Sequence, residues 1–150
     1  MTGARIAVGS DHAGFGLKQD LADHLRKNGY QVDDLGAHSE DSVDYPEYGA
    51  LVARAVVNGD ADYGVCVCGT GIGIGIAANK VPGARAAVVH DVTSARMARQ
   101  HNNANVVCMG ARVTGPQAAA DALDAFLGAE FEGGRHQRRI DAISALESGG

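Results

Sequence analysis

The chain has 150 residues, of which 45% are hydrophobic, and its formal net charge is −5 at pH 7. A chain of this length can bury the core of one domain without disulfides or metal ions, and its acidic balance argues against general nucleic-acid binding. Three cysteines without paired spacing form no disulfide framework, and the sequence has neither a signal pattern nor an apolar run of membrane length. We therefore expect a single soluble domain over residues 1–150, in a reducing cytoplasm.

The chain alternates strand and helix patterns from end to end. We predict strands at residues 5–9, 30–35, 63–68, 85–89 and 105–109. The first predicted helix carries Leu17, Leu21 and Leu25 on one stripe and ends at the Asn-Gly pair 28–29. The later helices are predicted from 45 to 58, over the Ala-rich segment before 82, from 93 to 100, from 114 or 115 to 127, and from 135 to about 147.

This order of elements predicts an α/β fold, a three-layer α/β/α sandwich with a five-stranded, parallel, Rossmann-like sheet and an additional C-terminal helix. Ligands of such sheets bind at the carboxyl ends of the strands. The polar residues that we expect at that edge are Asp11, His12, residues 68–73, His90, Asp91, residues 101–103 and Arg112. Several such groups on one edge favour a functional site, although each alone also fits a helix cap, a solvated loop residue or a polar turn.

The most informative segment is Cys68-Gly69-Thr70-Gly71-Ile72-Gly73, where a buried strand passes through a glycine loop into a helix. Glycines let the backbone approach a ligand, and the first N–H groups of a helix have no internal partners, so the segment suits an anion. Cys68 stands at the edge of this loop, where a cluster of amides favours a thiolate and gives the residue base or nucleophile character. The alternative is a small buried residue that ends a strand.

Related motifs do not fit this loop. A phosphate-binding P-loop requires glycine before Lys80, where the chain has Asn79. A relaxed dinucleotide-binding pattern at residues 73–78 begins inside the predicted helix rather than on the turn. No Cys/His spacing indicates a structural zinc site, so we expect no metal and assign Cys66 and Cys108 to the core.

The C-terminal region adds a cluster of positive charge. Arg135 and Arg139 are four residues apart and therefore share one face of the predicted helix, where two guanidinium groups suit a phosphate. Positive charge at a helix start is unfavourable for the helix dipole, which argues against a purely stabilising role. The alternative is a solvated charged face.

Seven segments, in order and at compatible spacing over nearly the whole chain, resemble the ribose-5-phosphate isomerase B family. That family also contains isomerases of allose, galactose and tetrose phosphates. The segments are Gly9-Ser10-Asp11-His12-Ala13-Gly14, Asp44-Tyr45-Pro46, Cys68 to Gly73, Ile76-Ala77-Ala78-Asn79-Lys80, Arg99-Gln100-His101-Asn102-Asn103, Gly110-Ala111-Arg112 and Gly133-Gly134-Arg135-His136-Gln137-Arg138-Arg139.

The resemblance implies an aldose–ketose isomerase that works through an enediolate, without metal or organic cofactor, in dimers whose sites lie between subunits. It implies that Cys68 is the base between C1 and C2, that Thr70 helps to move hydroxyl protons, and that His101 opens the furanose ring. One branch of the family carries its base as a glutamate at the position of Ile74, which cannot take a proton. The implied anion hole for the enediolate consists of the amides of Gly69, Gly71, Ile72 and Gly73.

The same resemblance implies the residues that hold the substrate. Asp11 and Asn102 would hold sugar hydroxyls, and Tyr45 is counted among the substrate-binding residues. The implied phosphate ligands are His12, Arg112, Arg135 and Arg139, some of them from a partner subunit. We expected His101 at the same sheet edge as Cys68, on a loop. His90 has no role that the resemblance assigns.

We therefore expect a homodimer, or a dimer of dimers, that interconverts ribose 5-phosphate and ribulose 5-phosphate, with residues 136–147 packing on a partner subunit. We expect no nucleic-acid or membrane partner. One alternative is an isomerase of a four- or six-carbon sugar phosphate, of the erythrulose 4-phosphate, allose 6-phosphate or galactose 6-phosphate type. Another is a non-catalytic domain that binds a sugar phosphate or nucleotide. A thiol redox protein is disfavoured because no resolving cysteine is present.

Overall fold

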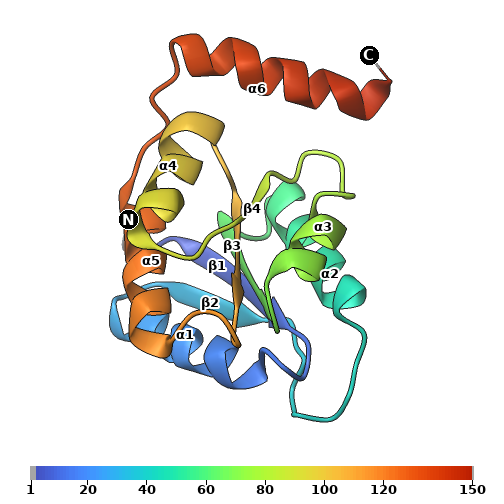
Figure 1. The fold of residues 1–150 in the computed structure, drawn as a ribbon, viewed down its shortest axis with the longest axis vertical. Coiled ribbons are helices and arrows are strands. Elements are labelled where there is room, and N and C mark those ends of the chain that lie inside the picture. Colours follow the sequence, from blue (N-terminus) through green and yellow to red (C-terminus); the bar gives the residue numbers. More distant parts are fainter. Residues whose placement is uncertain (1–2, 150) are drawn as a thin grey trace.

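Five parallel strands form the centre of the structure, a computed structural model that describes residues 3–149 (Figure 1). The strands are β1 (Arg5–Ser10), β2 (Gln31–Asp34), β3 (Tyr63–Cys68), β4 (Ala86–Val88) and β5 (Val106–Gly110). Their order across the sheet is β2-β1-β3-β5-β4, so β3 is central and β4 is an edge strand. The predicted α/β fold with a five-stranded parallel sheet is confirmed.

Helices cover both faces of the sheet because alternate residues of each central strand are apolar on opposite sides. The helices are α1 (Phe15–Lys27), α2 (Tyr45–Val57), α3 (Ile72–Ala78), α4 (Val92–Asn102), α5 (Pro116–Gly128) and α6 (Arg135–Ala145), followed by a 3-10 turn at Leu146–Ser148. Side chains of α1, α4 and α5 pack on one face with Val65 and Val67 of β3. Side chains of α2 and α3 pack on the other face with Cys66 and Cys68. None of the helices in residues 3–149 is long and apolar enough to cross a membrane.

The end of α4 differs from the sequence prediction. The helix continues through His101 and Asn102, which we expected on a loop, and it ends where Asn103 adopts a left-handed conformation with φ 47°. A helix that follows a parallel strand runs back toward the amino ends of the strands, and the side chain of Arg85, just before β4, donates through Nε to the carbonyl oxygen of Asn102 at 2.9 Å. His101 therefore lies at the opposite edge of the sheet from Cys68, and the expectation of a shared edge was wrong.

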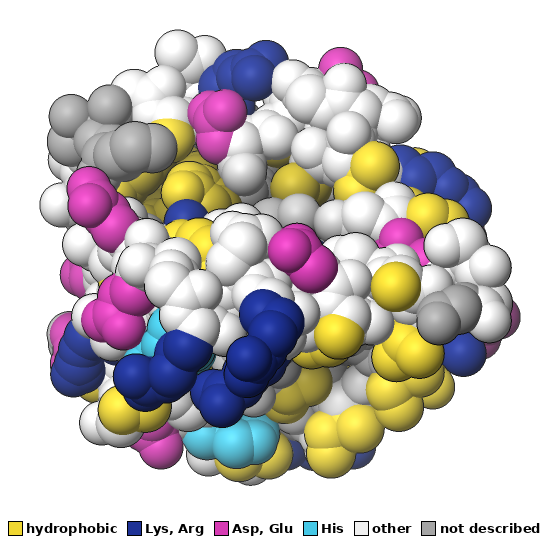
Figure 2. Space-filling view, turned by 90° about the horizontal axis from the view of Figure 1, so that it is seen from above, with side chains coloured by type: hydrophobic (Ala, Val, Ile, Leu, Met, Phe, Trp, Pro, Cys, Tyr) yellow, Lys and Arg dark blue, Asp and Glu magenta, His cyan; other side chains and the backbone are white. Residues whose placement is uncertain are grey.

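Helix α6 lies across the end of the molecule where the strands begin, beyond the sheet and its two helix layers (Figure 1). Only His136 and Ile140 of this helix are buried, whereas Ile143 is 50% exposed and Leu146 is 71% exposed. Figure 2 looks onto this end of the molecule and shows basic and hydrophobic side chains exposed on it. The packing of residues 136–147 on a partner subunit stays a prediction, as does the extent of the single domain.

Candidate functional site

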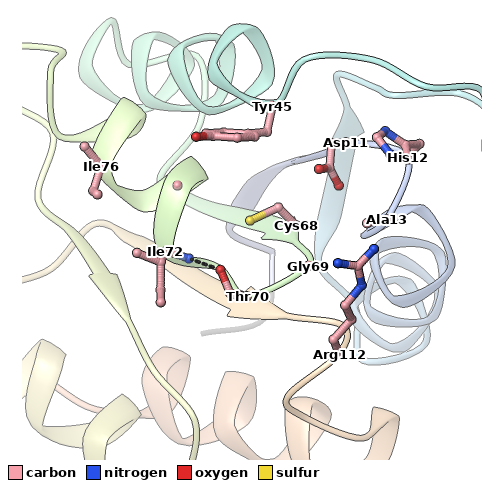
Figure 3. Close-up of a pocket in the computed structure, with 11 residues that line it drawn as sticks. Asp11, His12, Ala13, Tyr45, Cys68, Gly69, Thr70, Ile72, Ile76 and Arg112 are labelled. Atoms are coloured by element: carbon pink, nitrogen blue, oxygen red, sulfur yellow. Dashed lines mark hydrogen bonds between the residues drawn. The ribbon is translucent and has the colours of Figure 1, made fainter.

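A cleft of about 520 Å³ opens at the carboxyl edge of the sheet, where the sequence analysis placed the site (Figure 3). Loops that follow β1, β3 and β5 form its walls together with the starts of α2 and α3. The cleft is lined by Asp11, His12, Ala13, Tyr45, Cys68, Gly69, Thr70, Ile72, Gly73, Ile76 and Arg112. The central strand therefore delivers Cys68 to a cleft that also contains Asp11, His12 and Arg112.

Cys68 ends β3 and is 4% exposed. The backbone N–H of Gly71 donates to its Sγ at 3.1 Å, and the N–H of Ile72 donates to Thr70 Oγ1 at 3.2 Å. An N–H aimed at the sulfur is suited to hold the negative charge of a thiolate. The glycine loop thus directs its donors toward the sulfur and the neighbouring hydroxyl, as an anion-binding loop does.

Two glycines allow this loop to fold so closely around the cleft. Gly71 has φ +80°, and a Cβ there would lie 2.8 Å from the carbonyl carbon of Met109 in β5. A Cβ on Gly73 would lie 2.5 Å from the ring of Tyr45. Because the loop is packed between β5 and an aromatic ring, a side chain at either position would push it away from the sulfur.

The loop after β1 contributes a carboxylate and an imidazole. Asp11 is 6% exposed, and its Oδ1 accepts from the N–H of Gly14 at 2.9 Å. This bond holds the turn before α1, whose N-cap position is held by Gly14 and not by Asp11. His12 Nδ1 accepts from the N–H of Val43 at 3.2 Å. In a neutral ring this bond leaves the proton on Nε2, so that His12 presents an N–H donor from its other nitrogen.

A buried ammonium group holds the neighbouring loop in place. The side chain of Lys18 is fully buried, and its Nζ donates to Asp34 Oδ1 at 2.7 Å and to the carbonyl oxygen of Ala37. The N–H of Ala37 donates to the carbonyl oxygen of Ser10 at 2.7 Å. These contacts fasten the β2–α2 loop to the end of β1, directly beside Asp11.

Arg112 forms the third wall, after β5. Its N–H donates to the carbonyl oxygen of Gly69 at 3.0 Å, and the N–H of Ala111 donates to the carbonyl oxygen of Cys68 at 2.9 Å. These bonds hold the two loops together, and Figure 3 shows the Arg112 guanidinium on the side of the cleft where His12 and Ala13 lie. A guanidinium and an imidazole N–H on one side of a cleft form a suitable pair of donors for a phosphate.

Five residues that the sequence analysis assigned to the site are not among those that line this cleft. Gly71 is buried beside it, where its N–H donates to Cys68 Sγ, and the other four lie at the opposite end of the sheet. His101 and Asn102 are on the last turn of α4, and Arg135 and Arg139 are on α6, at the other end of the sheet. The ring of His101 instead stacks on that of His136, with centroids 4.4 Å apart and planes 12° apart. Within one chain, these residues of α4 and α6 cannot contact a ligand that is held beside Cys68.

The structure adds Ala13 and Ile76 to the cleft, which the site prediction did not include. Ile76 is 58% exposed and follows Ile72, which is 53% exposed, by one helical turn on α3. In the sequence, Ile72 and Ile76 have the i, i+4 spacing that ordinarily predicts a core-facing stripe, so the pattern gave no sign that Ile76 lines the cleft.

The other two cysteines are core residues, as expected. Cys66 and Cys108 are fully buried partners across β3 and β5. A hydrogen bond with Cys108, followed by burial, raises the pKa of the Cys66 thiol well above its ordinary value. Cys66 therefore stays a protonated thiol near neutral pH and does not compete with Cys68 as a base.

Comparison with known proteins gives one consistent family. Residues 6–143 match the family described as Ribose/Galactose Isomerase. The chain is 50% identical over 143 residues to "Ribose-5-phosphate isomerase B" of Escherichia coli, covering 95% of this chain and 96% of the relative. A solved structure of Clostridium thermocellum ribose-5-phosphate isomerase B superposes with a TM-score of 0.96 at 52% identity, covering 97% of this chain and 98% of that one. The Mycoplasma genitalium enzyme, solved with bound ribulose-5-phosphate, superposes with a TM-score of 0.93 at 44% identity, covering 99% of each chain.

Proposed function

The chain belongs to the ribose/galactose isomerase family, and we propose that it interconverts D-ribose 5-phosphate and D-ribulose 5-phosphate through an enediolate. The observation that carries this proposal is the position of Cys68, at the end of the central strand, with a backbone N–H aimed at its sulfur in a cleft that also holds Asp11, His12 and Arg112. A base beside a set of amide donors is the arrangement that proton transfer next to a carbonyl requires.

In the proposed reaction, the Cys68 thiolate removes the proton from C2 of the open-chain aldose. The electron pair moves to the carbonyl, which gives an enediolate whose negative oxygen is held by amides of residues 69–73. The Cys68 thiol then returns the proton to C1, and Thr70 carries a proton between the two neighbouring oxygens. Ile74 is fully buried and apolar, so this chain has no carboxylate base at that position of the loop.

The phosphate is proposed to lie on the side of the cleft where His12 and Arg112 are found. His12 offers Nε2–H, because its other nitrogen is occupied by the N–H of Val43, and Arg112 offers a guanidinium fork. Asp11, at the end of β1, holds a sugar hydroxyl. Tyr45 contacts the sugar from the start of α2, where its ring lies against Gly73 and borders the cleft (Figure 3).

The remaining proposed residues come from a second copy of the chain. His101 opens the furanose ring, Asn102 holds a hydroxyl, and Arg135 and Arg139 complete the phosphate site. Since these residues lie at the far end of their own sheet, only a partner subunit can bring them to the Cys68 cleft. A two-fold homodimer, alone or as a dimer of dimers, makes both sites equivalent, and the exposed Ile143 and Leu146 support a contact through this end.

A panel of four-, five- and six-carbon aldose phosphates tests the proposal. We expect the highest kcat/KM for ribose 5-phosphate, measured as ketose formation, and competitive inhibition by inorganic phosphate. Higher kcat/KM for a tetrose or hexose phosphate would reassign the substrate within the family. Saturable binding without turnover of any sugar phosphate would reject the enzyme in favour of a binding domain.

A further inference from the structure

Three side chains form a cluster at the end of the molecule where the strands of the sheet begin, away from the Cys68 cleft. His101, Glu132 and His136 each offer one donor atom, and the three atoms lie within 4.8 Å of one another. Glu132 Oε1 is 3.8 Å from His101 Nε2 and 3.7 Å from His136 Nε2, which is longer than a hydrogen bond. Two imidazoles and a carboxylate therefore converge without bonding directly to one another.

The backbone builds this cluster rather than leaving it to mobile side chains. The N–H of Glu132 donates to the carbonyl oxygen of Gln100 at 2.9 Å, which fixes the carboxylate beside the last turn of α4. Gly133 and Gly134 follow with φ 66° and 54°, a turn that side chains rarely tolerate. This turn starts α6 in the direction that stacks His136 on His101.

The three side chains of the cluster differ in their exposure to solvent. The side chain of His136 is 10% exposed, that of His101 33% and that of Glu132 52%. The exposure of Glu132 leaves the cluster accessible to water, which can supply a further ligand.

We propose that His101, Glu132 and His136 bind one divalent transition-metal ion of the zinc class, and that the bound ion inhibits isomerisation by occupying His101. Zinc prefers imidazole and carboxylate donors about 2.0 to 2.2 Å away, so the three atoms must move closer together and one of the two stacked rings must reorient to surround it. Two imidazoles disfavour magnesium and calcium, which take oxygen ligands. Arg135 and Arg139 oppose a cation nearby, and the Glu132 carboxylate offsets part of that repulsion.

Metal binding has a geometric consequence for His101. The lone pair of an imidazole nitrogen lies in the plane of its ring, and two rings only 12° from parallel cannot both point at one ion. The more exposed ring, that of His101, must therefore turn. The bound ion then holds the turned ring of His101 and removes it from ring opening. This inhibitory step rests on the function proposed above, whereas metal binding does not.

Binding is tested on the native protein with Co²⁺ as a spectroscopic probe and Zn²⁺ in calorimetry. We expect one ion per chain, with d–d absorption typical of nitrogen and oxygen ligands, and a loss of affinity of about tenfold or more in His136→Ala and Glu132→Gln. His24→Ala is the matched control, because His24 pairs with Asp124 on another surface. Affinity that is unchanged in His136→Ala, an intense thiolate-to-cobalt band from Cys68, or no binding would each overturn the site.

Inhibition is tested by two activities in the presence of Zn²⁺. We expect zinc to slow conversion of ribose 5-phosphate while leaving exchange of the ketose C1 proton with solvent, because exchange needs no ring opening. Loss of both activities would place the ion on Cys68 and overturn the inhibitory assignment, as would zinc binding without any effect on ribose 5-phosphate conversion. If the native protein isomerises no sugar phosphate, the proposed function fails, but the cobalt titration still decides the metal site.

Discussion

The N–H of Gly71 donates to the sulfur of Cys68, three residues earlier, at 3.1 Å. This contact exists because Gly71 adopts φ +80° and lies against the backbone of Met109, where no other residue fits. The left-handed turn brings the amide back over the end of its own strand. A single glycine therefore both starts α3 and supplies a donor to the proposed base.

Replacing Cys68 with alanine should abolish isomerisation. Loss of a positioned base costs about 10²-fold or more in kcat, while the phosphate ligands of the cleft remain. The measurement is ketose formation from ribose 5-phosphate, with inorganic phosphate binding as the control for an intact site. A variant that keeps more than about a tenth of native turnover would show that another group is the base.

Alkylation of the native protein should follow the burial of its thiols. Cys68 lines the cleft, whereas Cys66 and Cys108 are 0% exposed and Cys66 has a raised pKa. Iodoacetamide at neutral pH should therefore modify Cys68 alone, and saturating ribose 5-phosphate should slow the reaction. Peptide mass spectrometry identifies the labelled cysteine and measures its rate of labelling. If saturating substrate leaves the rate at Cys68 unchanged, Cys68 does not lie in the substrate site.

Arg135 and Arg139 should act on the phosphate, and Arg138 between them provides the control. All three are exposed on α6, where Arg135 and Arg139 are about 40° apart around the helix axis and Arg138 lies about 60° beyond Arg135, outside the sector that the pair spans. We expect Arg135→Ala or Arg139→Ala to raise KM and lower kcat, because binding energy at the phosphate positions the sugar. Inhibition by inorganic phosphate should nearly vanish in the double variant and persist in Arg138→Ala. Equal phosphate inhibition in all the variants would mean that the phosphate binds elsewhere.

Much of the fold and of the cleft could be predicted because local signals agree with the topology. The stretch that ends at Cys68 is apolar at every position after Tyr63 except one glycine, and the Asn-Gly pairs end α1 and α2 as expected. The carboxyl-edge rule for parallel sheets then placed Asp11, Cys68 and Arg112 in one cleft.

The position of His101 could not be predicted in this way. Its polar neighbours indicate a loop, yet the helix continues until Asn103 adopts the left-handed conformation, which asparagine tolerates better than most residues. The larger error was the edge of the sheet at which His101 was expected, because a segment that precedes a parallel strand lies at the amino end of the sheet. The sequence pattern of one chain also contains no information about which residues a second copy contributes.

The stability of α4 should depend on pH through Asp91. Its Oδ1 accepts from the N–H of Ser94 at 2.6 Å, and this hydrogen bond lowers the pKa of the carboxyl. Because the folded pKa lies below the unfolded value, the stabilisation is complete above the unfolded pKa and is lost as pH falls through the folded one. Asp91→Ala should therefore lower the Tm at pH 7 and have a diminishing effect toward pH 2; a difference in Tm that does not depend on pH would mean that the charge plays no part.

His101 should be required for only one of two proton transfers. Cyclic ribose 5-phosphate has no free carbonyl, and histidine is the side chain suited to exchange protons near neutral pH during ring opening. Ribulose 5-phosphate cannot close a stable furanose, so His101→Asn should still exchange its C1 proton with heavy water while aldose conversion is severely slowed. Cys68→Ala should lose both activities. The measurement is deuterium uptake into ribulose 5-phosphate, followed by NMR. Loss of this exchange in His101→Asn would show that His101 and Cys68 do not have separate roles.

Mixed dimers should restore activity if the site is shared between subunits. In a random mixture of Cys68→Ala and His101→Asn chains, about half of the dimers are mixed, and each mixed dimer holds one site with both native residues. We therefore expect about a quarter of native activity from two inactive variants refolded or co-expressed together. Cys68→Ala paired with Cys68→Ser is the control, because no combination of those chains contains a native base. If the mixture stays as inactive as its components, His101 and Cys68 do not meet across an interface, and the shared site proposed for this chain is wrong.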